Sequence, residues 1–491
     1  SRGLGDVYKR QVLLWENPFL LSYSGFVFSV MAVIAIGVGA NVLLEWEHSW
    51  KRRQQAGEET IKKTFFSRQK EGILVSFAIQ LFTIPLVAYS YYEIPVYAML
   101  INLFVLAVVN GLLGLTVLGV IVGMAFLPAG RVLFAPCGWM LDSYRFLCEV
   151  SLKIPGAQRI TGKPAHMRIF WYYLGLGVFL LAIYACARRN EKHKDGRETA
   201  DLCVSRRKKR LQGIVFSCFI AFLLLFLLFP QKKSFEIDFL DVGQGDGIYL
   251  CTGGGTSMFI DGGSTDVKQV GKYRILPFLK AKGVSEISYW FVSHTDTDHV
   301  SGLKEVLVSG YRVEYLVFAK AVEKEAKTKE LAELARSHGT KVLYMQAGDT
   351  VRSKRAAMRC LYPKAADKAE DVNDLCLVLQ FEEGDISALF GGDISTDVEE
   401  QLLRRRKWDK VLVFKADHHG SRYANAEALL KCIRPEITVA SAGKDNRYGH
   451  PSPDAVQRIK ESGSRFFCTI EGGRIRVRVI ENKLVCETYV K

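Results

Sequence analysis

The apolar positions in the first half of the chain form long runs of the length that crosses a lipid bilayer. A spanning helix needs about 20 predominantly apolar residues. Runs of this kind lie at 23–44, 73–92, 96–127, 169–187 and 211–229. The run at 96–127 is too long for one upright helix and contains "NGLLG" at 110–114, so a broken hairpin is one reading of it. A semi-apolar patch at 131–150 is compatible with a further span, a re-entrant segment or an interfacial helix.

The uneven distribution of charge predicts how these spans are oriented. Residues 1–233 carry 28 Lys and Arg against 14 Asp and Glu, whereas residues 234–491 carry 38 against 37. Two loops between apolar runs hold much of the surplus, with seven Lys or Arg in 46–71 and ten in 187–210. Because basic loops stay in the cytoplasm, the last span should lead outwards and place the second half outside the cytoplasm. This orientation requires an even number of crossings between 93 and 168, which a broken 96–127 hairpin, or one span there plus one at 131–150, would supply.

These patterns divide the chain into three expected segments. Residues 1–11 fit none of the later patterns, and we expect them to be a cloning or assembly scar at the start of a fragment. Residues 12–233 should form a polytopic helical membrane domain, and residues 234–491 a separate domain. The 11 cysteines show no C-x-x-C pair, which disfavours a zinc ribbon or a disulfide framework and favours buried free thiols.

From residue 235 the pattern changes to short strands separated by glycine turns. Examples are "FEIDFLDVGQGDGIYLCT", "ISYWFVSH", "ISALFGGD" and "KVLVFKADHHGS". Helical stretches lie between such strands, for example at 322–338 and 396–407. Strands that alternate with a few helices predict a layered α/β sandwich.

Histidines and aspartates follow directly after several predicted strands. They are His294, Asp296, Asp298, His299, Asp393, His418, His419 and His450. The H-x-D-x-D-H spacing lets four polar side chains of one loop converge, the first two on one metal ion and the last two on a neighbouring ion. Asp393 is suited to bridge both ions, as in two-metal hydrolysis. Taken singly, these motifs also fit a polar turn, a Gly-Gly-Asp turn or a helix start capped by Ser421, but their succession after apolar strands favours a metal site.

The order of these motifs resembles that of a known family. The motifs are "FLDVGQGDG", "FIDGG", "SHTDTDHVSG", "GGD", "HHGS" and "YGHP". They resemble the metallo-β-lactamase-like domain of ComEC-type competence DNA-internalisation proteins, and the segments at 17–37 and 75–113 resemble that family's membrane competence domain. The resemblance covers 17–491 and implies an amino-terminally truncated member, with an αββα sandwich after the membrane domain.

The resemblance implies a function and a set of site residues. The implied protein is a multi-pass channel of the bacterial cytoplasmic membrane that passes one DNA strand while its extracytoplasmic domain degrades the other. Its further partners would be membrane lipid, a DNA receptor and a cytoplasmic motor. Carried over by position, the metal ligands would be His294, Asp296, Asp298, His299, Asp393, His419 and His450. Asp298, His418 and His419 would act in catalysis, with His418 or His419 as proton donor, and the supporting residues would be Asp241, Asp246, Asp261 and Asn373.

One departure from the wider superfamily bears on the metal. A histidine is usual between the first histidine loop and the bridging aspartate, but here "EDVNDLCLVL" offers only Asn373 and Asp374. With Asp296 also standing in place of a histidine, the two expected sites lean toward carboxylate, which favours Mn²⁺ over Zn²⁺. Two alternatives remain open: a domain that guides DNA without turnover, and a membrane-tethered hydrolase of small phosphoesters.

Overall fold

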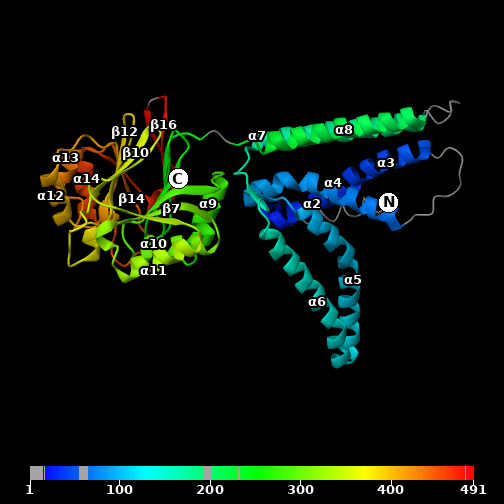
Figure 1. The fold of residues 1–491 in the computed structure, drawn as a ribbon, viewed down its shortest axis with the longest axis horizontal. Coiled ribbons are helices and arrows are strands. Elements are labelled where there is room, and N and C mark those ends of the chain that lie inside the picture. The colour runs from blue at the N-terminus through cyan, green and yellow to red at the C-terminus, as the bar shows by residue number, and fades with distance from the viewer. Residues whose placement is uncertain are drawn as a thin grey trace. The chain divides into compact units, whose positions relative to one another are not determined.

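The chain divides into two compact units, Ser1–Pro230 and Gln231–Lys491, each of which has its own hydrophobic core. The structure is a computed structural model and describes residue 15 and residues 17–54, 65–192, 202–230, 233–481 and 483–490 (Figure 1). The segment 1–11 that we expect to be a scar lies outside the described residues.

The described part of the first unit consists mainly of helices, with two very short strands. Its main helices are α2 (Ser24–Ile34), α3 (Asn41–Gln54), α4 (Phe65–Tyr91), α5 (Ala98–Ala125), α6 (Leu127–Leu152), α7 (His166–Lys192) and α8 (Leu202–Leu227). A short π-helical segment, η2 (Ala35–Ala40), joins α2 to α3. Among the described residues, four helices are long and apolar enough to cross a membrane: Ser24–Trp50, Lys70–Tyr91, His166–Asn190 and Arg207–Leu227. These four coincide with four of the five predicted runs, and the chain is a membrane protein.

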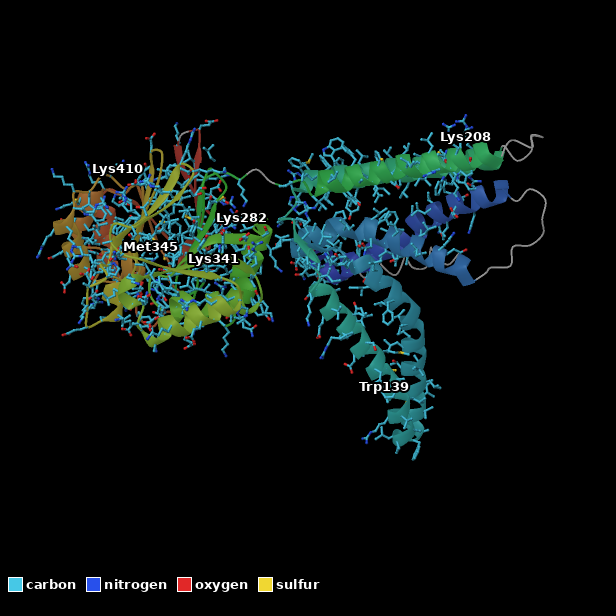
Figure 2. All side chains as sticks on the ribbon, viewed as in Figure 1. Trp139, Lys208, Lys282, Lys341, Met345 and Lys410 are labelled. Atoms are coloured by element: carbon cyan, nitrogen blue, oxygen red, sulfur yellow. The ribbon has the colours of Figure 1, made fainter. Side chains whose placement is uncertain are left out.

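The fifth run differs from the broken hairpin that "NGLLG" suggested. Helix α5 continues through this sequence without a break and pairs with α6, which contains the semi-apolar patch, in a helical hairpin (Figure 1). A Cβ on Gly130 would lie 2.6 Å from Cα of Gly123, so two glycines allow the helices to approach closely beside their connection. Trp139 lies on α6 and is largely exposed (Figure 2). The turn of this hairpin is therefore between α5 and α6 rather than inside the apolar run.

Contacts inside the first unit sort the helix ends into two groups. Beside the basic loops, Lys209 of α8 pairs with Glu47 of α3 at 2.9 Å. At the opposite helix ends, β1 (Glu93–Pro95) pairs with β2 (Gln158–Ile160), and Arg168 of α7 donates to the carbonyl of Phe229. Strand β1 precedes α5 and strand β2 follows α6. Because β1 and β2 pair, the chain enters and leaves the α5–α6 hairpin at the same side of the unit, opposite the basic loops.

The second unit contains two mixed sheets. The first has the order β17-β16-β3-β4-β5-β6-β7-β8 and the second β15-β14-β13-β12-β11-β10-β9. The strands of the first sheet are β3 (Glu236–Phe239), β4 (Gly247–Cys251), β5 (Ser257–Asp261), β6 (Glu286–Phe291), β7 (Arg312–Ala319), β8 (Lys341–Met345), β16 (Ile475–Ile480) and β17 (Lys483–Thr488). Those of the second are β9 (Thr350–Ser353), β10 (Ala356–Tyr362), β11 (Val378–Glu383), β12 (Ile386–Phe390), β13 (Val413–Lys415), β14 (Ile437–Ala440) and β15 (Arg465–Cys468).

Three apolar layers hold this unit together. The layer between the sheets includes Phe291 of β6 and Phe381 of β11. Trp290 belongs to a second layer with α9 (Leu276–Ala281), α10 (Thr297–Val308) and α11 (Ala326–Ser337), because alternate strand residues face opposite sides. Phe414 belongs to a third layer with α12 (Thr396–Arg405), α13 (Glu427–Ile433) and α14 (Pro453–Glu461) (Figure 1). The expected αββα sandwich after a polytopic helical region is confirmed.

Candidate metal centre

The candidate site lies on loops that leave the carboxyl ends of parallel strands. Strands β5 and β6 are parallel in the first sheet, and β12, β13 and β14 are parallel in the second. Loops at the carboxyl ends of parallel strands share one edge of a sheet. The polar residues on these ends are Asp261 of β5, His294 to His299 after β6, Asp393 after β12, His418 and His419 after β13, and His450 after β14.

Glycines allow these loops to pack against the histidine loop. A Cβ on Gly245 would lie 2.4 Å from the carbonyl oxygen of Asp298, and a Cβ on Gly263 would lie 2.4 Å from that of Thr297. Distances this short exclude any side chain without movement of the backbone. The glycines of "GQGDG" and "FIDGG" are therefore required for the close approach of three loops.

Asp393 occupies the centre of the site. Its Oδ2 lies 3.3 Å from Nε2 of His299 and 3.4 Å from Nε2 of His419. Oδ2 of Asp298 lies 3.7 Å from the same Nε2 of His419. Both Nε2 atoms and Oδ1 of Asp393 are buried and make no hydrogen bond. Since buried polar atoms normally have a partner, their convergence indicates a position for a bound group.

The convergent atoms suit a divalent metal ion. Ligand atoms held at about 2.0–2.1 Å from one ion would lie roughly 3.4 Å from each other, close to the separations around Asp393. Two overlapping groups place their ligand atoms within 4.8 Å of one another: Asp246, His299, Asp393 and His419, and His294, Asp298 and His299. Imidazole with carboxylate is a ligand set for zinc, manganese or iron.

The first half of the H-x-D-x-D-H motif is less enclosed than the second. His294 is buried, and its Nδ1 contacts Sγ of Cys376 at 3.4 Å, which leaves Nε2 as the available ligand atom. Asp296 is about half exposed, with Oδ2 4.0 Å from Nε2 of His294. Its Oδ1 accepts from Nζ of Lys327 at 2.9 Å. Asp296 therefore lies at the rim of the cluster, with one oxygen already paired.

His418 and His450 face the cleft beside the centre. Nε2 of His418 lies 3.8 Å from Oδ2 of Asp393, and the side chain is 33% exposed. Its ring centroid is 5.6 Å from that of His450, on which Tyr448 stacks. His418 and His419 both have left-handed backbones, with φ of +48° and +55°. This uncommon conformation sends consecutive rings in different directions, His419 into the cluster and His418 toward solvent.

Asp261 supports the centre from behind. Its carboxylate accepts from the backbone N–H of Ser293 at 2.8 Å and from the Ser293 hydroxyl at 2.8 Å. Its Oδ2 also lies 3.0 Å from Nδ1 of His299. A carboxylate on Nδ1 fixes the ring orientation and leaves Nε2 to a ligand.

The structure separates the two aspartates of "DVGQGDG". Asp246 is buried, with Oδ1 3.6 Å from Nδ1 of His419 and Oδ2 2.7 Å from Nζ of Lys415. Asp241 is half exposed and pairs instead with Arg274 at 2.9 Å, so it is not brought to the cluster. Asn373 lines the cleft.

Two site residues escaped the sequence reasoning. Lys415 was hidden by its position at the end of an apolar strand, where a lysine ordinarily reaches solvent. Cys376, in the segment that lacks the usual histidine, contacts His294 and accepts from the backbone N–H of Asp393 at 3.4 Å. The only sequence signal was position: Lys415 lies shortly before "HHGS", and Cys376 lies in "EDVNDLCLVL".

The centre shifts the pKa values of its members in opposite directions. Burial opposes ionisation of Asp393, but His419 and His299 outweigh it and hold the pKa of its carboxyl well below 3.8. Burial likewise disfavours the imidazolium of His299, yet Asp393 and Asp261 raise its pKa well above 6.5, and Asp393 and Asp246 do the same for His419. Without a metal ion, two imidazolium groups therefore neutralise the carboxylates.

The remaining histidines of the cleft behave differently. Burial, and then repulsion by His299, lower the pKa of His294 to about 4. Burial, and then His419 and His418, lower the pKa of His450 to about 4. Both rings are neutral at neutral pH, which is the form that ligates a metal ion.

Known proteins with similar sequences cover both halves of the chain. Residues 10–185 match the family model described as "Competence protein". ComE operon protein 3 of Bacillus subtilis is 24% identical over 485 residues, which cover 95% of this chain and 57% of that protein. Recombination protein 2 of Haemophilus influenzae is 26% identical over 274 residues, 55% of this chain and 32% of that protein. The chain thus spans about half or less of the length of these relatives.

A solved structure with similarity to the chain is the metallo-beta-lactamase fold protein YhfI from Bacillus subtilis. It is 12% identical and has a TM-score of 0.33, with coverage of 48% of this chain and 96% of that protein. The alignment with ComE operon protein 3 extends over almost the whole chain, and therefore over the membrane helices and the metal cluster together. The chain is thus similar to competence proteins over nearly its whole length, in agreement with its resemblance to the ComEC type.

Proposed function

We propose that this chain takes part in DNA uptake across the bacterial cytoplasmic membrane, and that its second unit hydrolyses DNA phosphodiesters with divalent metal ions. The observation that carries the hydrolase proposal is the convergence of buried, unsatisfied ligand atoms from His299, His419 and Asp393 beside an open cleft. The cleft measures about 290 Å³ and is lined almost entirely by polar side chains. With divalent ions bound to offset the carboxylates of Asp296, Asp298 and Asp393, such a cleft would suit a phosphodiester anion.

The ligands of the proposed centre would be Asp393 and His299 with His294, Asp298, His419 and His450 around them, and Asp296 at the rim. When bound, metal ions supply an activated water and neutralise charge on the phosphoryl oxygens. Asp261 fixes the His299 ring. His418 is exposed to the cleft and close to Asp393, so its Nε2 is the group we assign to protonate the leaving oxygen. Manganese is the ion to test first, because the half-exposed Asp296 replaces an imidazole.

A second pocket next to the cleft favours a nucleic acid over a small ester as the proposed substrate. It measures about 280 Å³ and shares Thr297 with the catalytic cleft. Its lining includes the hydroxyls of Thr295 and Ser301 and the ammonium groups of Lys304 and Lys327. Both lysines form partly exposed ion pairs, which are weak. A phosphate next to the one cleaved would find donors here.

The membrane unit supports the proposed orientation. The basic loops flank the helix ends joined by the Lys209–Glu47 pair, and Phe229, which precedes the second unit, lies at the opposite ends. By the positive-inside rule, the hydrolase unit would be extracytoplasmic. The α5–α6 hairpin returns to the side from which it starts, which meets the requirement for an even number of crossings. We propose that these helices form the conduit for one DNA strand.

The nuclease proposal predicts metal-dependent cleavage. The chain, purified in detergent and stripped with EDTA, should cut labelled DNA only after Mn²⁺ or another divalent ion is added. Asp298→Ala should lower the rate at least about 100-fold, whereas Asp385→Ala, which alters an exposed turn carboxylate, should not change it. A panel of single-stranded DNA, double-stranded DNA and bis(p-nitrophenyl) phosphate identifies the substrate class. Metal binding without turnover of any of them would leave only a DNA-guiding module.

The second pocket gives a separate prediction. Lys304→Gln should weaken DNA binding for all sequences and reduce the slope of log K against log salt by about 1, as expected for one lost phosphate contact. The rate on bis(p-nitrophenyl) phosphate should stay the same, because that substrate does not reach the pocket. Lys460→Gln on the exposed face of α14 is the matched control. An unchanged salt slope for Lys304→Gln would remove this pocket from the DNA path.

A further inference from the structure

Lys415 is a fully buried cation beside the proposed metal centre. Its side chain, at the end of β13, is 1% exposed. The Nζ atom lies 2.7 Å from Oδ2 of Asp246 and donates to the carbonyl of Ala416 at 3.0 Å. Burial of an ammonium group is costly unless a charge and hydrogen bonds compensate it. Its location therefore needs a reason beyond packing.

Asp246 approaches the metal centre from behind His419. Its Oδ1 lies 3.6 Å from Nδ1 of His419, the ring nitrogen that donates to the carbonyl of Ser441 at 3.0 Å. The opposite nitrogen, Nε2, faces Asp393 and Asp298. By residue type and distance alone, Asp246 belongs to one of the two ligand groups. Its direction argues otherwise. Oδ1 of Asp246 faces Nδ1 of His419, whereas the other expected ligands lie on the Nε2 side of the ring.

The Lys415–Asp246 pair also joins the two sheets. Lys415 belongs to the second sheet, whereas Asp246 lies in the β3–β4 loop of the first. The backbone N–H of Asp246 donates to the carbonyl of Asp298 at 3.1 Å, and its carbonyl accepts from Gly263 at 3.0 Å. The pair thus connects the strand that leads to His419 with the loop that carries Asp298.

We propose that Lys415 is a positioning residue that permanently neutralises Asp246, so that Asp246 supports His419 and is not itself a metal ligand. The ammonium group holds one carboxylate oxygen, and a divalent ion on the same carboxylate would be repelled by it. The ion is thereby confined to the side of Asp298, His299 and Asp393. The inference rests on the proposed metal site but not on the proposed substrate.

A double-variant cycle tests this assignment. The EDTA-stripped full chain in detergent is titrated with Mn²⁺ by calorimetry for the wild type, Lys415→Met, Asp246→Asn and the double variant. The double variant removes both charges and the support that Asp246 gives to His419, so its Mn²⁺ affinity should fall by about 10–100-fold, as for a residue that only supports a metal ligand. Lys415→Met alone leaves Asp246 buried and unpaired, so the melting temperature of the metal-free chain should fall by roughly 10 °C. Mn²⁺ should then raise that temperature by more than in the wild type, because it neutralises the freed carboxylate.

The outcomes separate the possibilities. A loss of well over 100-fold in Mn²⁺ affinity in the double variant would show that Asp246 is a ligand, and an unchanged affinity would show that it does not support His419; either would overturn the inference. If Lys415→Met lowers the melting temperature by the same amount with and without Mn²⁺, the lysine has only a structural role. This result would also overturn the inference. If the single variants fail to fold, the double variant alone decides. A wild-type chain that binds no divalent ion would instead reject the metal site itself, and an active nuclease is not needed for any of these readouts.

Discussion

Asp393→Asn should remove metal binding and DNA cleavage together while leaving the sandwich folded. Among the described residues, Asp393 is the one carboxylate whose oxygen lies within 4 Å of Nε2 of His299, His418 and His419. The amide is neutral and no longer offsets the charge of a divalent ion. Variants of residues that only support a metal ligand already lose about 10–100-fold in affinity, so the loss here should be at least 100-fold.

The measurement for Asp393→Asn is Mn²⁺ titration of the stripped chain, followed by the cleavage assay. Asp385→Asn, the same change in an exposed turn, is the matched control. Far-ultraviolet circular dichroism should be the same for both variants, because the side chain of Asp393 makes no hydrogen bond that holds a strand. Retention of Mn²⁺ affinity within tenfold would mean that the ion is bound elsewhere and that the cluster around Asp393 is not the centre.

The sequence was sufficient for most of the architecture, because its signals are periodic. Long apolar runs correspond to α2 to α4, α7 and α8, and short apolar segments correspond to β6 and β12, the strands that precede His294 and Asp393. It left two readings open at "NGLLG", where glycine and asparagine would weaken an isolated helix, and the structure has one helix in this run followed by another over the patch at 131–150. The glycines at the contact between α5 and α6 lie after this sequence, at Gly119, Gly123 and Gly130, and α5 is continuous through both regions.

The site was predictable as a set of ligand types but not as a set of contacts. The order of the motifs indicates which strand ends carry ligands. It does not indicate that Asp241 turns outward to Arg274 while Asp246, five residues later, is buried against His419. That difference depends on how glycine-rich loops fold over the histidine loop. Nor does a sequence pattern distinguish a lysine whose ammonium group is buried, such as Lys415, from one that reaches solvent.

The pH dependence of stability above pH 6.5 should be much weaker with metal than without it. In the metal-free chain, His299 and His419 have folded-state pKa values well above 6.5, against the opposing effect of burial, because Asp393 faces both. Their contribution to stability is fully present below pH 6.5 and is lost as the pH rises through the folded-state values. Asp393 has the reverse behaviour: its contribution is present above pH 3.8 and is lost as the pH falls through its lowered pKa. The metal-free chain should therefore lose stability on going from pH 6.5 upward.

Bound metal cancels this trend above pH 6.5, because a divalent ion takes only the neutral imidazoles and displaces their protons. Each displaced proton makes the apparent free energy of metal binding more favourable by about 1.4 kcal/mol per pH unit until the imidazole is neutral. Thermal unfolding of the stripped and the Mn²⁺-loaded chain between about pH 6 and pH 8.5 measures both slopes. In Asp393→Asn the metal-free slope should flatten, since the carboxylate that raises both imidazole pKa values is gone. Parallel slopes with and without Mn²⁺ would mean that protons and metal do not compete for His299 and His419, and that the ion lies on other ligands.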